Sequence, residues 1–298
     1  MLLSELGEFG LIQRLKKRIK LDRTVVKGTG DDCAVLKRDK YRYQLIPCDM
    51  LVEGVDFTLK DKPGLIGRKA VFVSVSDIAA CAGNPRHCVV SLAVPGKTKV
   101  SFIDELFKGM LDAAKTFSIN IVGGDLSRSE KIIIDVSMLG EVKKSELVTR
   151  SGAKAGDIIF TTGALGGSIY GKHLKFTPRL KEARELVKRY KINSMIDISD
   201  GLAQDLGHIM DESGVGAIVY EDLIPLSADA RDILDALYSG EDFELLFTAS
   251  RAQAHRIMAG GLKGISAIGE IVDKKLGLRL VDKKLRERAI KPKGFRHF

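Results

Sequence analysis

Tryptophan is absent from this chain of 298 residues, and cysteine and proline are scarce, with four and seven residues respectively. The cysteines lack C-x-x-C spacing and three of them lie in apolar stretches, which argues against a disulfide framework or a zinc site. No apolar run approaches the roughly 18 residues of a membrane-spanning helix, and the first residues lack the basic and apolar regions of a secretory signal. These absences predict a cytoplasmic protein without a membrane partner.

The charge balance shows a moderate excess of basic residues. There are 48 Lys and Arg residues against 39 Asp and Glu, a formal net charge of +9, and a basic protein can attract nucleic acid. The basic clusters lie at 14–20, 181–191 and 282–293, and acids are interleaved in the last two, which is typical of solvated helix faces or a polar tail. We therefore expect no nucleic-acid partner. A basic nucleic-acid-binding module remains the alternative from another class of function.

Aspartates at the ends of short apolar runs are the most prominent feature that is present. Five runs end in this way, and their aspartates are Asp32, Asp49, Asp77, Asp125 and Asp197. Any one of them could be a turn or cap residue, but several have neighbouring glycines, which let a backbone approach a phosphate closely. If these ends converge, a cation must neutralise the repulsion between the carboxylates, and oxygen ligands favour Mg²⁺. The sequence therefore predicts a magnesium-phosphate site.

A glycine-rich segment at 163–168 follows an expected strand at 157–162. A turn of this kind can hold phosphate through its backbone N–H groups, but the segment is neither a Walker A motif nor a complete dinucleotide fingerprint. A plain tight turn explains it equally well.

The order of apolar runs and helical periods indicates the class of fold. We expect helices at 5–20, 65–83, 102–117 and 180–190, strands at 33–36, 41–48, 89–94, 119–122 and 132–139, and loops at 49–57 and around Gly124–Asp125. The sequence turns polar over 143–154, which predicts a boundary between domains 1–145 and 146–298. The regular crossover spacing of one large parallel sheet is missing, so the pattern predicts two α+β domains.

A set of motifs, in order along nearly the whole chain, resembles a known family. The motifs are Gly30-Asp31-Asp32-Cys33-Ala34, Asp49-Met50-Leu51-Val52-Glu53-Gly54, Ser76-Asp77-Ile78-Ala79-Ala80, Gly123-Gly124-Asp125, Thr149-Arg150-Ser151-Gly152-Ala153, Asp197-Ile198-Ser199-Asp200-Gly201-Leu202, Gly240-Glu241-Asp242-Phe243-Glu244-Leu245 and Lys293-Gly294-Phe295-Arg296-His297-Phe298. Together they resemble the thiamine-monophosphate kinase family, of the aminoimidazole ribonucleotide synthetase superfamily.

The resemblance implies a fold and a reaction. The fold is the two-domain α+β fold of the superfamily, in which an N-terminal mixed sheet with helices forms the interface of a homodimer and a C-terminal α+β domain completes the substrate and nucleotide site. The reaction is transfer of the γ-phosphoryl group of ATP to the phosphate of thiamine monophosphate, giving thiamine diphosphate and ADP, assisted by several Mg²⁺ ions. No general acid or base is expected, because the acceptor phosphate is already largely ionised at neutral pH.

The matching positions imply roles for particular residues. The expected metal ligands are Asp32, Asp49, Asp77, Asp125, Asp197 and Asp200. The expected ATP-binding residues are Gly124, Asp125, Arg150 and Ser199, and the expected substrate-binding residues are Asp56, Glu241 and Phe295. Structural alternatives remain for two of them, since Arg150 could pair with an interdomain acid and Phe295 could pack in the C-terminal core. Asp31 is expected only to cap a turn.

The sequence departs from the family pattern at two places. Pro47-Cys48 stands where many relatives have Ser-Thr, so only backbone carbonyls could contribute to a metal shell there. Asp56 stands where many relatives have a histidine near the substrate phosphate. The alternative interpretation is therefore a related kinase or ATP-dependent ligase of the superfamily that acts on another phosphorylated heterocycle.

Overall fold

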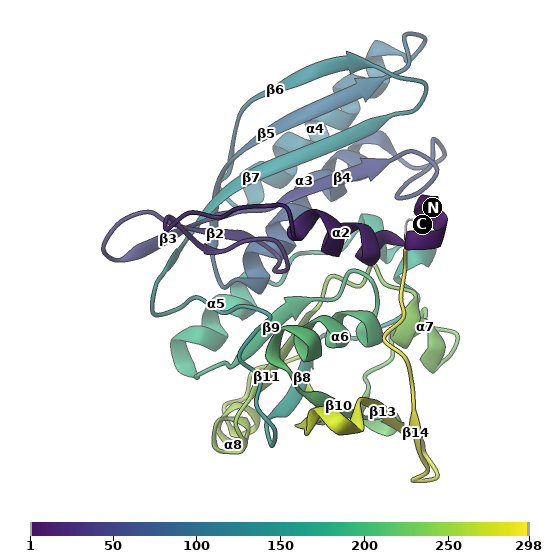
Figure 1. Ribbon diagram of the computed structural model, residues 1–298. Helices are drawn as coiled ribbons and strands as arrows, with labels where there is room; N and C mark the ends of the chain where they lie inside the picture. The colour runs from purple at the N-terminus through teal and green to yellow at the C-terminus, as the bar shows by residue number, and fades with distance from the viewer. Residues whose placement is uncertain (1, 297–298) are drawn as a thin grey trace.

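Two seven-stranded sheets, one above the other in Figure 1, organise the computed structural model, which describes residues 2–296. His297 and Phe298, the end of the last motif, lie outside the described residues. The first sheet has the order β1-β2-β3-β7-β5-β6, with β4 also paired to β7. Its strands are β1 (Val25–Lys27), β2 (Ala34–Lys37), β3 (Arg42–Ile46), β4 (Cys48–Val52), β5 (Asn84–Val94), β6 (Asn120–Arg128) and β7 (Ile133–Lys143).

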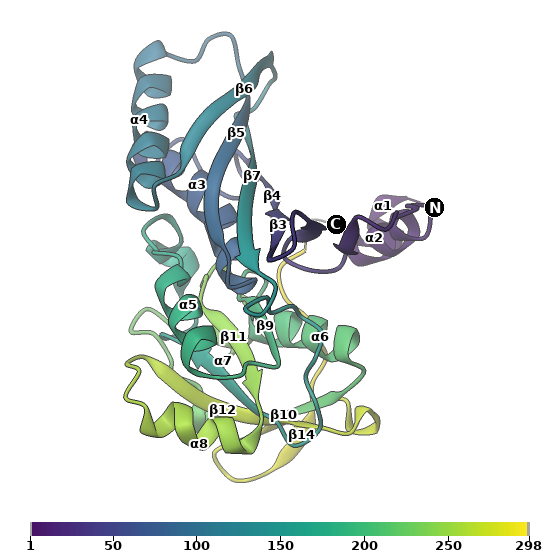
Figure 2. The same cartoon turned by 90° about the vertical axis from the view of Figure 1, so that its left-hand side faces the viewer.

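Helices cover only one face of this first sheet. Alternate residues of β7, such as Ile134, Val136 and Met138, are buried against α3 (Pro63–Ala80) and α4 (Val100–Thr116), as expected for strands with one face in the core. Figure 2 shows both helices on one side of the sheet, while the short helices α1 (Leu3–Leu6) and α2 (Glu8–Lys16) project away on the other side. The face of β5 and β7 opposite α3 is therefore an open face.

The crossing of α3 and α4 depends on two glycines. A Cβ atom at Gly67 would lie 1.9 Å from the Leu106 carbonyl oxygen, and one at Gly109 would lie 1.9 Å from the Gly64 carbonyl oxygen. The backbones of the two helices are therefore in direct contact, and neither position has room for a side chain.

We expect Gly67→Ala to lower the free energy of unfolding by about 1–3 kcal/mol, because the added methyl group must push the helices apart. The change runs against helix propensity, which favours alanine by about 1 kcal/mol. Gly64→Ala on the same helix is the matched control, since its Cβ would meet Glu105 O at an ordinary 3.6 Å. Urea unfolding measures both variants, and equal midpoints would contradict the prediction.

The second sheet has helices on both faces. Its order is β14-β13-β10-β12-β8-β11-β9, antiparallel except for the pair β10 and β13. The strands are β8 (Ile158–Thr162), β9 (Ser194–Asp197), β10 (Gly216–Tyr220), β11 (Leu245–Ala249), β12 (Ile265–Val272), β13 (Leu278–Val281) and β14 (Glu287–Ala289). The helices are α5 (Leu180–Arg189), α6 (Leu202–Ser213), α7 (Ile233–Tyr238) and α8 (Arg251–Ala259).

Adjacent residues of the central strands β8 and β11 point into two different hydrophobic cores. Phe160 and Phe247 stack at a centroid distance of 5.1 Å on the side of α5 and α8, and their core continues into that of the first domain. Ile159 and Leu246 point the other way, into a separate core with α6 and α7. The core that contains Phe160 and Phe247 is therefore one continuous hydrophobic cluster that joins the two domains.

Several sequence predictions need correction. The expected loop at Gly124–Asp125 is wrong, because β6 runs without interruption through both residues. The first residues of the expected loop at 49–57 belong to β4, which follows β3 after Pro47. The expected helix at 5–20 is divided into α1 and α2 at Gly7. Gly123 and Gly124 form no turn, because β5 lies alongside them and supplies their hydrogen-bond partners.

The predicted domain boundary at 145/146 falls in the segment between the end of β7 at Lys143 and the start of β8 at Ile158. No helix within residues 2–296 combines the length and the hydropathy that a bilayer crossing requires.

Candidate active site

Three carboxylates meet where the two domains face each other. Asp32 lies in the turn before β2, Asp77 lies near the end of α3, and Asp197 ends β9 of the second sheet. One oxygen from each of these side chains lies within 4.8 Å of the other two. The structure thus brings together three aspartates that are far apart in the sequence.

Asp49 joins this group from β4. Its carboxylate accepts a hydrogen bond from Ser74 Oγ on α3 at 2.7 Å and interacts with Asp77. Two residues further along the same helix, Ser76 Oγ donates to Asp197 at 2.5 Å. The two serines lie in the otherwise apolar stretch 70–76 of this helix, and each holds one aspartate. We call Asp32, Asp49, Asp77 and Asp197 the carboxylate cluster.

Burial and mutual repulsion change the titration of the carboxylate cluster. Burial, with the neighbouring charges of Asp135 and Asp32, raises the pKa of Asp49 to about 6. Burial and the charge of Asp32 raise the pKa of Asp197 to about 7. Burial, Asp49 and Asp197 hold the pKa of Asp77 well above its ordinary value. Several buried carboxylates at one place need a cation if all are to ionise at neutral pH.

The carboxylate cluster fits a divalent cation. Its donor set consists of carboxylate oxygens, which are the ligands that Mg²⁺ prefers. Asp32 Oδ2 is buried and makes no hydrogen bond with any residue in the described range 2–296. This oxygen is therefore available to a metal ion.

Arg150 is the cation that the chain itself places beside the cluster. Its Nη2 and Nε atoms donate to Asp32 Oδ1 at 2.8 and 3.2 Å. The pairing with an acid of the other domain, which the sequence left open, is thus present. The Arg150 backbone N–H contacts Asp31, whose side chain also accepts from the Asp32 N–H, so Asp31 has the structural role that was expected.

Asp200 lies in a second group of side chains. An oxygen of Asp200, an oxygen of Asp205 and a ring nitrogen of His208 lie within 4.8 Å of one another at the start of α6. Burial and the neighbouring Arg150 lower the pKa of His208 to about 4, so the imidazole is neutral at pH 7. Ser199, which was predicted to bind ATP, accepts the Glu241 N–H through its backbone carbonyl oxygen at 2.7 Å. The expected ligand Asp200 is therefore grouped with Asp205 and His208, in a loop shared with Asp197.

Asp125 lies outside the carboxylate cluster within one chain. It pairs in register with Ser91 of β5, which pairs with Asp135 of β7, which pairs with Met50 of β4. Three strand spacings of about 4.8 Å separate β6 from β4, or about 14 Å. Asp49 pairs instead with Val136 on the helix-covered face, so Asp125 and Asp49 are on opposite faces of the sheet.

Gly124 is required by the pairing of β5 and β6, because a Cβ there would lie 1.8 Å from the Val90 carbonyl oxygen. Gly124 and Asp125 also border a mainly apolar hollow of about 720 Å³ between β6 and α4, lined among others by Ile103, Phe107 and Leu126. This volume is within the usual range for a small-molecule site.

Lys69 connects the expected substrate residues. Its ammonium group contacts the Glu241 carboxylate, the Asp56 carbonyl oxygen at 2.9 Å and His173 Nδ1 at 3.2 Å. His173 also contacts Glu241 at 3.2 Å. The Asp56 carboxylate accepts the Val52 N–H at 2.7 Å. Asp56 and Glu241 are therefore brought together, although they come from different domains.

Lys69 and His173 were not predicted as site residues from the sequence. A lysine in the middle of the apolar run 65–80 was a usable indication, because an isolated charge on a buried helix needs a partner. His173, in the short 3₁₀ helix Lys172–Leu174, gave no comparable indication.

The segment after β14 crosses α6 and returns to the site. Pro292 lies against Gly207 of α6, and the Phe295 N–H donates to the Asp200 carbonyl oxygen at 3.0 Å. The Phe295 ring is 41% exposed, so it is not a core residue as the structural alternative required. In Figure 1 this segment rises from β14 past α6 towards α2, where Arg296 lies over the Phe9 ring.

The glycine-rich segment at 163–168 has its own partner. The Gly166 N–H donates to the Asp242 carboxylate at 2.9 and 3.0 Å, and Ser168 Oγ contacts the same group. The tight-turn interpretation therefore explains this segment, since an internal carboxylate already occupies the position of a phosphate.

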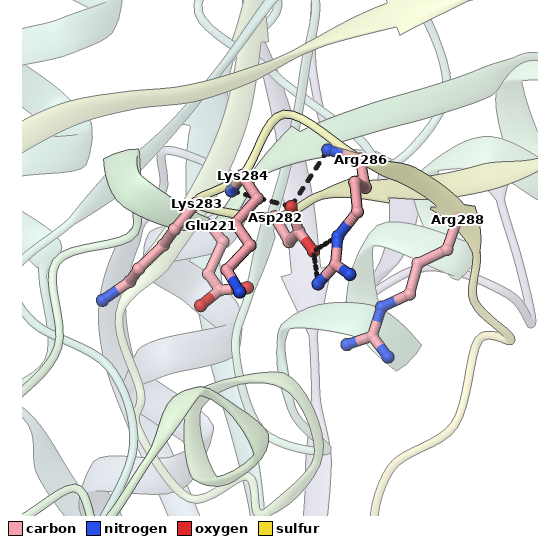
Figure 3. Close-up of a pocket in the computed structure, with 6 residues that line it drawn as sticks. All are labelled: Glu221, Asp282, Lys283, Lys284, Arg286 and Arg288. Carbon is pink, nitrogen blue, oxygen red and sulfur yellow. Dashed lines mark hydrogen bonds and ion pairs between the residues drawn. The ribbon is translucent and has the colours of Figure 1, made fainter.

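Basic side chains gather in a hollow of about 600 Å³ at the far end of the second domain, lined by Glu221, Asp282, Lys283, Lys284, Arg286 and Arg288. Figure 3 shows Asp282 between the basic side chains, with Arg286 Nε donating to it at 2.8 Å. The charges alternate here, and they do not form the continuous basic stripe that follows a phosphate backbone.

The chain matches known protein families over most of its length. Residues 30–142 match the family model of AIR synthase related protein, N-terminal domain, and residues 141–281 match that of the C-terminal domain. The solved HypE-HypF complex shares the fold, with a TM-score of 0.77 at 22% identity over 94% of this chain and 99% of that chain. The chain is therefore an AIR synthase related protein, and the predicted two-domain α+β fold is confirmed.

Relatives with higher sequence identity show which family within this class the chain belongs to. The thiamine-monophosphate kinase of Aquifex aeolicus (strain VF5) is 32% identical over the full length of both chains. That of Bacillus subtilis (strain 168) is 33% identical and covers 98% of this chain and all of the relative. The solved structure "AaThiL complexed with AMPPCP and TMP" has a TM-score of 0.87 at 31% identity and covers 100% of this chain and 99% of that chain. The chain belongs to the thiamine-monophosphate kinase family.

Proposed function

We propose that the protein transfers the γ-phosphoryl group of ATP to the phosphate of thiamine monophosphate, giving thiamine diphosphate and ADP. The observation that carries the proposal is the carboxylate cluster between the two domains of a chain in this family. The ATP triphosphate and the acceptor phosphate are both negatively charged, and the repulsion between these groups is the main obstacle to the reaction. A site that positions anions and offsets their charge is therefore what the chemistry needs.

Asp32, Asp49, Asp77 and Asp197 would hold Mg²⁺, and Asp200 is a further ligand. When bound, Mg²⁺ would offset the negative charge that develops during transfer. The serines on α3 keep Asp49 and Asp197 in place, and no side chain has to act as a general acid or base.

Arg150, Ser199, Gly124 and Asp125 would bind ATP. The fixed guanidinium fork of Arg150 suits a phosphate group, and exchange of its Asp32 partner for a phosphate would leave Asp32 to a metal ion. We also retain Asp125 as a proposed metal ligand. Because its carboxylate is distant from the carboxylate cluster, its metal ion would be one that also contacts the bound nucleotide.

Asp56, Glu241 and Phe295 would bind thiamine monophosphate. The Glu241 carboxylate can face the cationic ring, and the half-exposed Phe295 ring can pack on the flat substrate. Glu241 and Phe243 have positive φ angles of 60° and 51°, which are uncommon for such residues and concentrate at functional sites.

The assembly would be a cytoplasmic homodimer joined through the open face of the first sheet. Apolar side chains are exposed there, including Met50 (56% exposed), Val89 (39%) and Leu139 (38%). Exposed apolar groups on a sheet face favour pairing with a second copy. Asp125 belongs to the same face, so its surroundings would change on pairing.

An ADP-coupled assay tests the reaction. With ATP and Mg²⁺, we expect ADP release when thiamine monophosphate is present, and only background release with thiamine or buffer. A phosphorylated heterocycle of another kind serves as the comparison substrate for the related-kinase alternative. ATP hydrolysis that is independent of the acceptor, or salt-sensitive nucleic-acid binding without turnover, would contradict the proposal.

A further inference from the structure

Lys69 is a fully buried cation that forms an ion pair with the Glu241 carboxylate. Its exposure is 0%, and it stands on α3 among apolar residues such as Ile66 and Val73. Its ammonium group contacts Glu241 of the other domain, and the Asp56 carbonyl oxygen and His173 Nδ1 complete its surroundings. The side chains of Glu241 and His173 are 24% and 13% exposed, so the contact lies at the edge of the space between the domains.

A buried ion pair is not an efficient way to stabilise a fold. Apolar residues of similar volume are often equally or more stable, because both charges must lose their hydration. The Lys69 position is surrounded by the side chains of an apolar helix, where a methionine would suit a purely structural role. The presence of a lysine at this position therefore needs a function besides packing.

The position of Lys69 on α3 relates it to the carboxylate cluster. Lys69 and Ser76 are seven residues apart, which places them on the same face of the helix and about 10 Å apart along its axis. Ser76 holds Asp197, and Lys69 holds Glu241. One helix face thus presents an ammonium group at one end of the interdomain space and the carboxylate cluster at the other.

We propose that the Lys69–Glu241 ion pair opens when the acceptor binds, so that Lys69, with His173, holds the acceptor phosphate and Glu241 faces the cationic ring. This rests on the proposed function and identifies residues that select the acceptor. Thiamine monophosphate carries both a ring cation and a phosphate anion. It therefore supplies a partner for each member of the separated pair, and no charge is left without a partner.

The same exchange discriminates against other phosphate esters. A phosphate on an uncharged ring would pair with Lys69 but leave Glu241 buried next to a neutral group, which is costly. The ion pair thus selects for an acceptor with opposite charges at its two ends. His173 is a hydrogen-bonding partner here, and no proton transfer to or from it is required.

Steady-state kinetics of Lys69→Met, Glu241→Gln and the double variant test the proposal. We expect Lys69→Met to raise the KM for thiamine monophosphate by about 10–100-fold, while the KM for ATP changes less than twofold. Lys69→Arg should recover part of this loss. Lys16→Met, which removes another interdomain lysine-glutamate pair, with Glu212 at 3.3 Å, is the matched control and should leave both constants unchanged.

The double variant separates binding from structure. We expect it to unfold at nearly the wild-type temperature, because neither charge is left buried alone, yet to keep the raised KM for thiamine monophosphate. If the double variant recovers both stability and KM, the pair is only structural and the proposal is wrong. An unchanged KM in Lys69→Met would also overturn it while the proposed reaction stands. A wild-type protein that neither binds nor phosphorylates thiamine monophosphate would overturn both.

Discussion

Asp77→Asn is expected to lower kcat for phosphoryl transfer by about 10²–10³-fold while the protein remains folded. Loss of one preorganised group that stabilises the charge of the transition state typically has an effect of this size. The amide has nearly the shape of the carboxylate, so packing at the end of α3 is retained. It also removes one of the mutually repelling carboxylates, since burial and the charges of Asp49 and Asp197 raise the pKa of Asp77.

The stability of Asp77→Asn without metal separates a metal-binding role from a structural one. We expect its melting temperature in a chelator to equal or exceed that of the wild type, and its stabilisation by Mg²⁺ to be smaller. Asp211→Asn, at an exposed position on α6, is the matched control and should keep full activity. Wild-type kcat in Asp77→Asn would show that this carboxylate does not take part in the reaction.

The second large effect concerns pH. In the metal-free protein, stability should fall as the pH rises from about 4 to about 7. Burial, with the charge of Asp32, raises the pKa of Asp31 and of Asp197 to about 7, and burial raises that of Asp49 to about 6. The unfolded value is about 3.9. The folded state therefore binds more protons in this range, and stability decreases as those protons are lost.

His208 changes the stability with pH in the opposite direction. Its pKa of about 4 lies below the unfolded value of about 6.5, so it favours stability as the pH rises between these values. A carboxyl or imidazole group contributes at most about 1.4 kcal/mol per pH unit, so the three aspartates outweigh the one histidine. We expect the metal-free protein to be more stable at pH 5 than at pH 7.5, by a few kcal/mol in order of magnitude.

Thermal unfolding in chelator, and again with excess Mg²⁺, checks this prediction. Mg²⁺ should stabilise the protein strongly at pH 7.5 and little at pH 5, because protons compete for the same oxygens. A metal-free protein whose stability rises steadily from pH 5 to pH 7.5 would contradict the assignment of these groups.

Much of the fold follows from local pattern. The apolar run at 65–83 predicts α3, and the spacing at 102–117 predicts α4, because side-chain period and helix length agree there. The pattern could not predict that β6 continues through Gly124 and Asp125. Two glycines followed by an aspartate are typical of a turn, and only the neighbouring strand β5 makes the extended conformation favourable.

The candidate site likewise contains residues that the local sequence pattern predicts and residues that it does not. Asp32, Asp77 and Asp197 were predictable, since each lies next to an apolar run, and all three meet in the structure. Lys69 and His173 depend on how two domains dock, and no local pattern encodes that arrangement. The opposite placement of Asp49 and Asp125 was also hidden, because strand register decides which face of a sheet a residue occupies.

The dual attachment of α3 has a mechanical consequence. Lys69 holds Glu241 near one end of this rigid rod and Ser76 holds Asp197 near the other. A slide of the second domain along the rod by a single residue's rise, about 1.5 Å, would strain both attachments at once. When the Lys69–Glu241 pair opens, the contact between Ser76 and Asp197 is the one of these two attachments that still opposes such a slide.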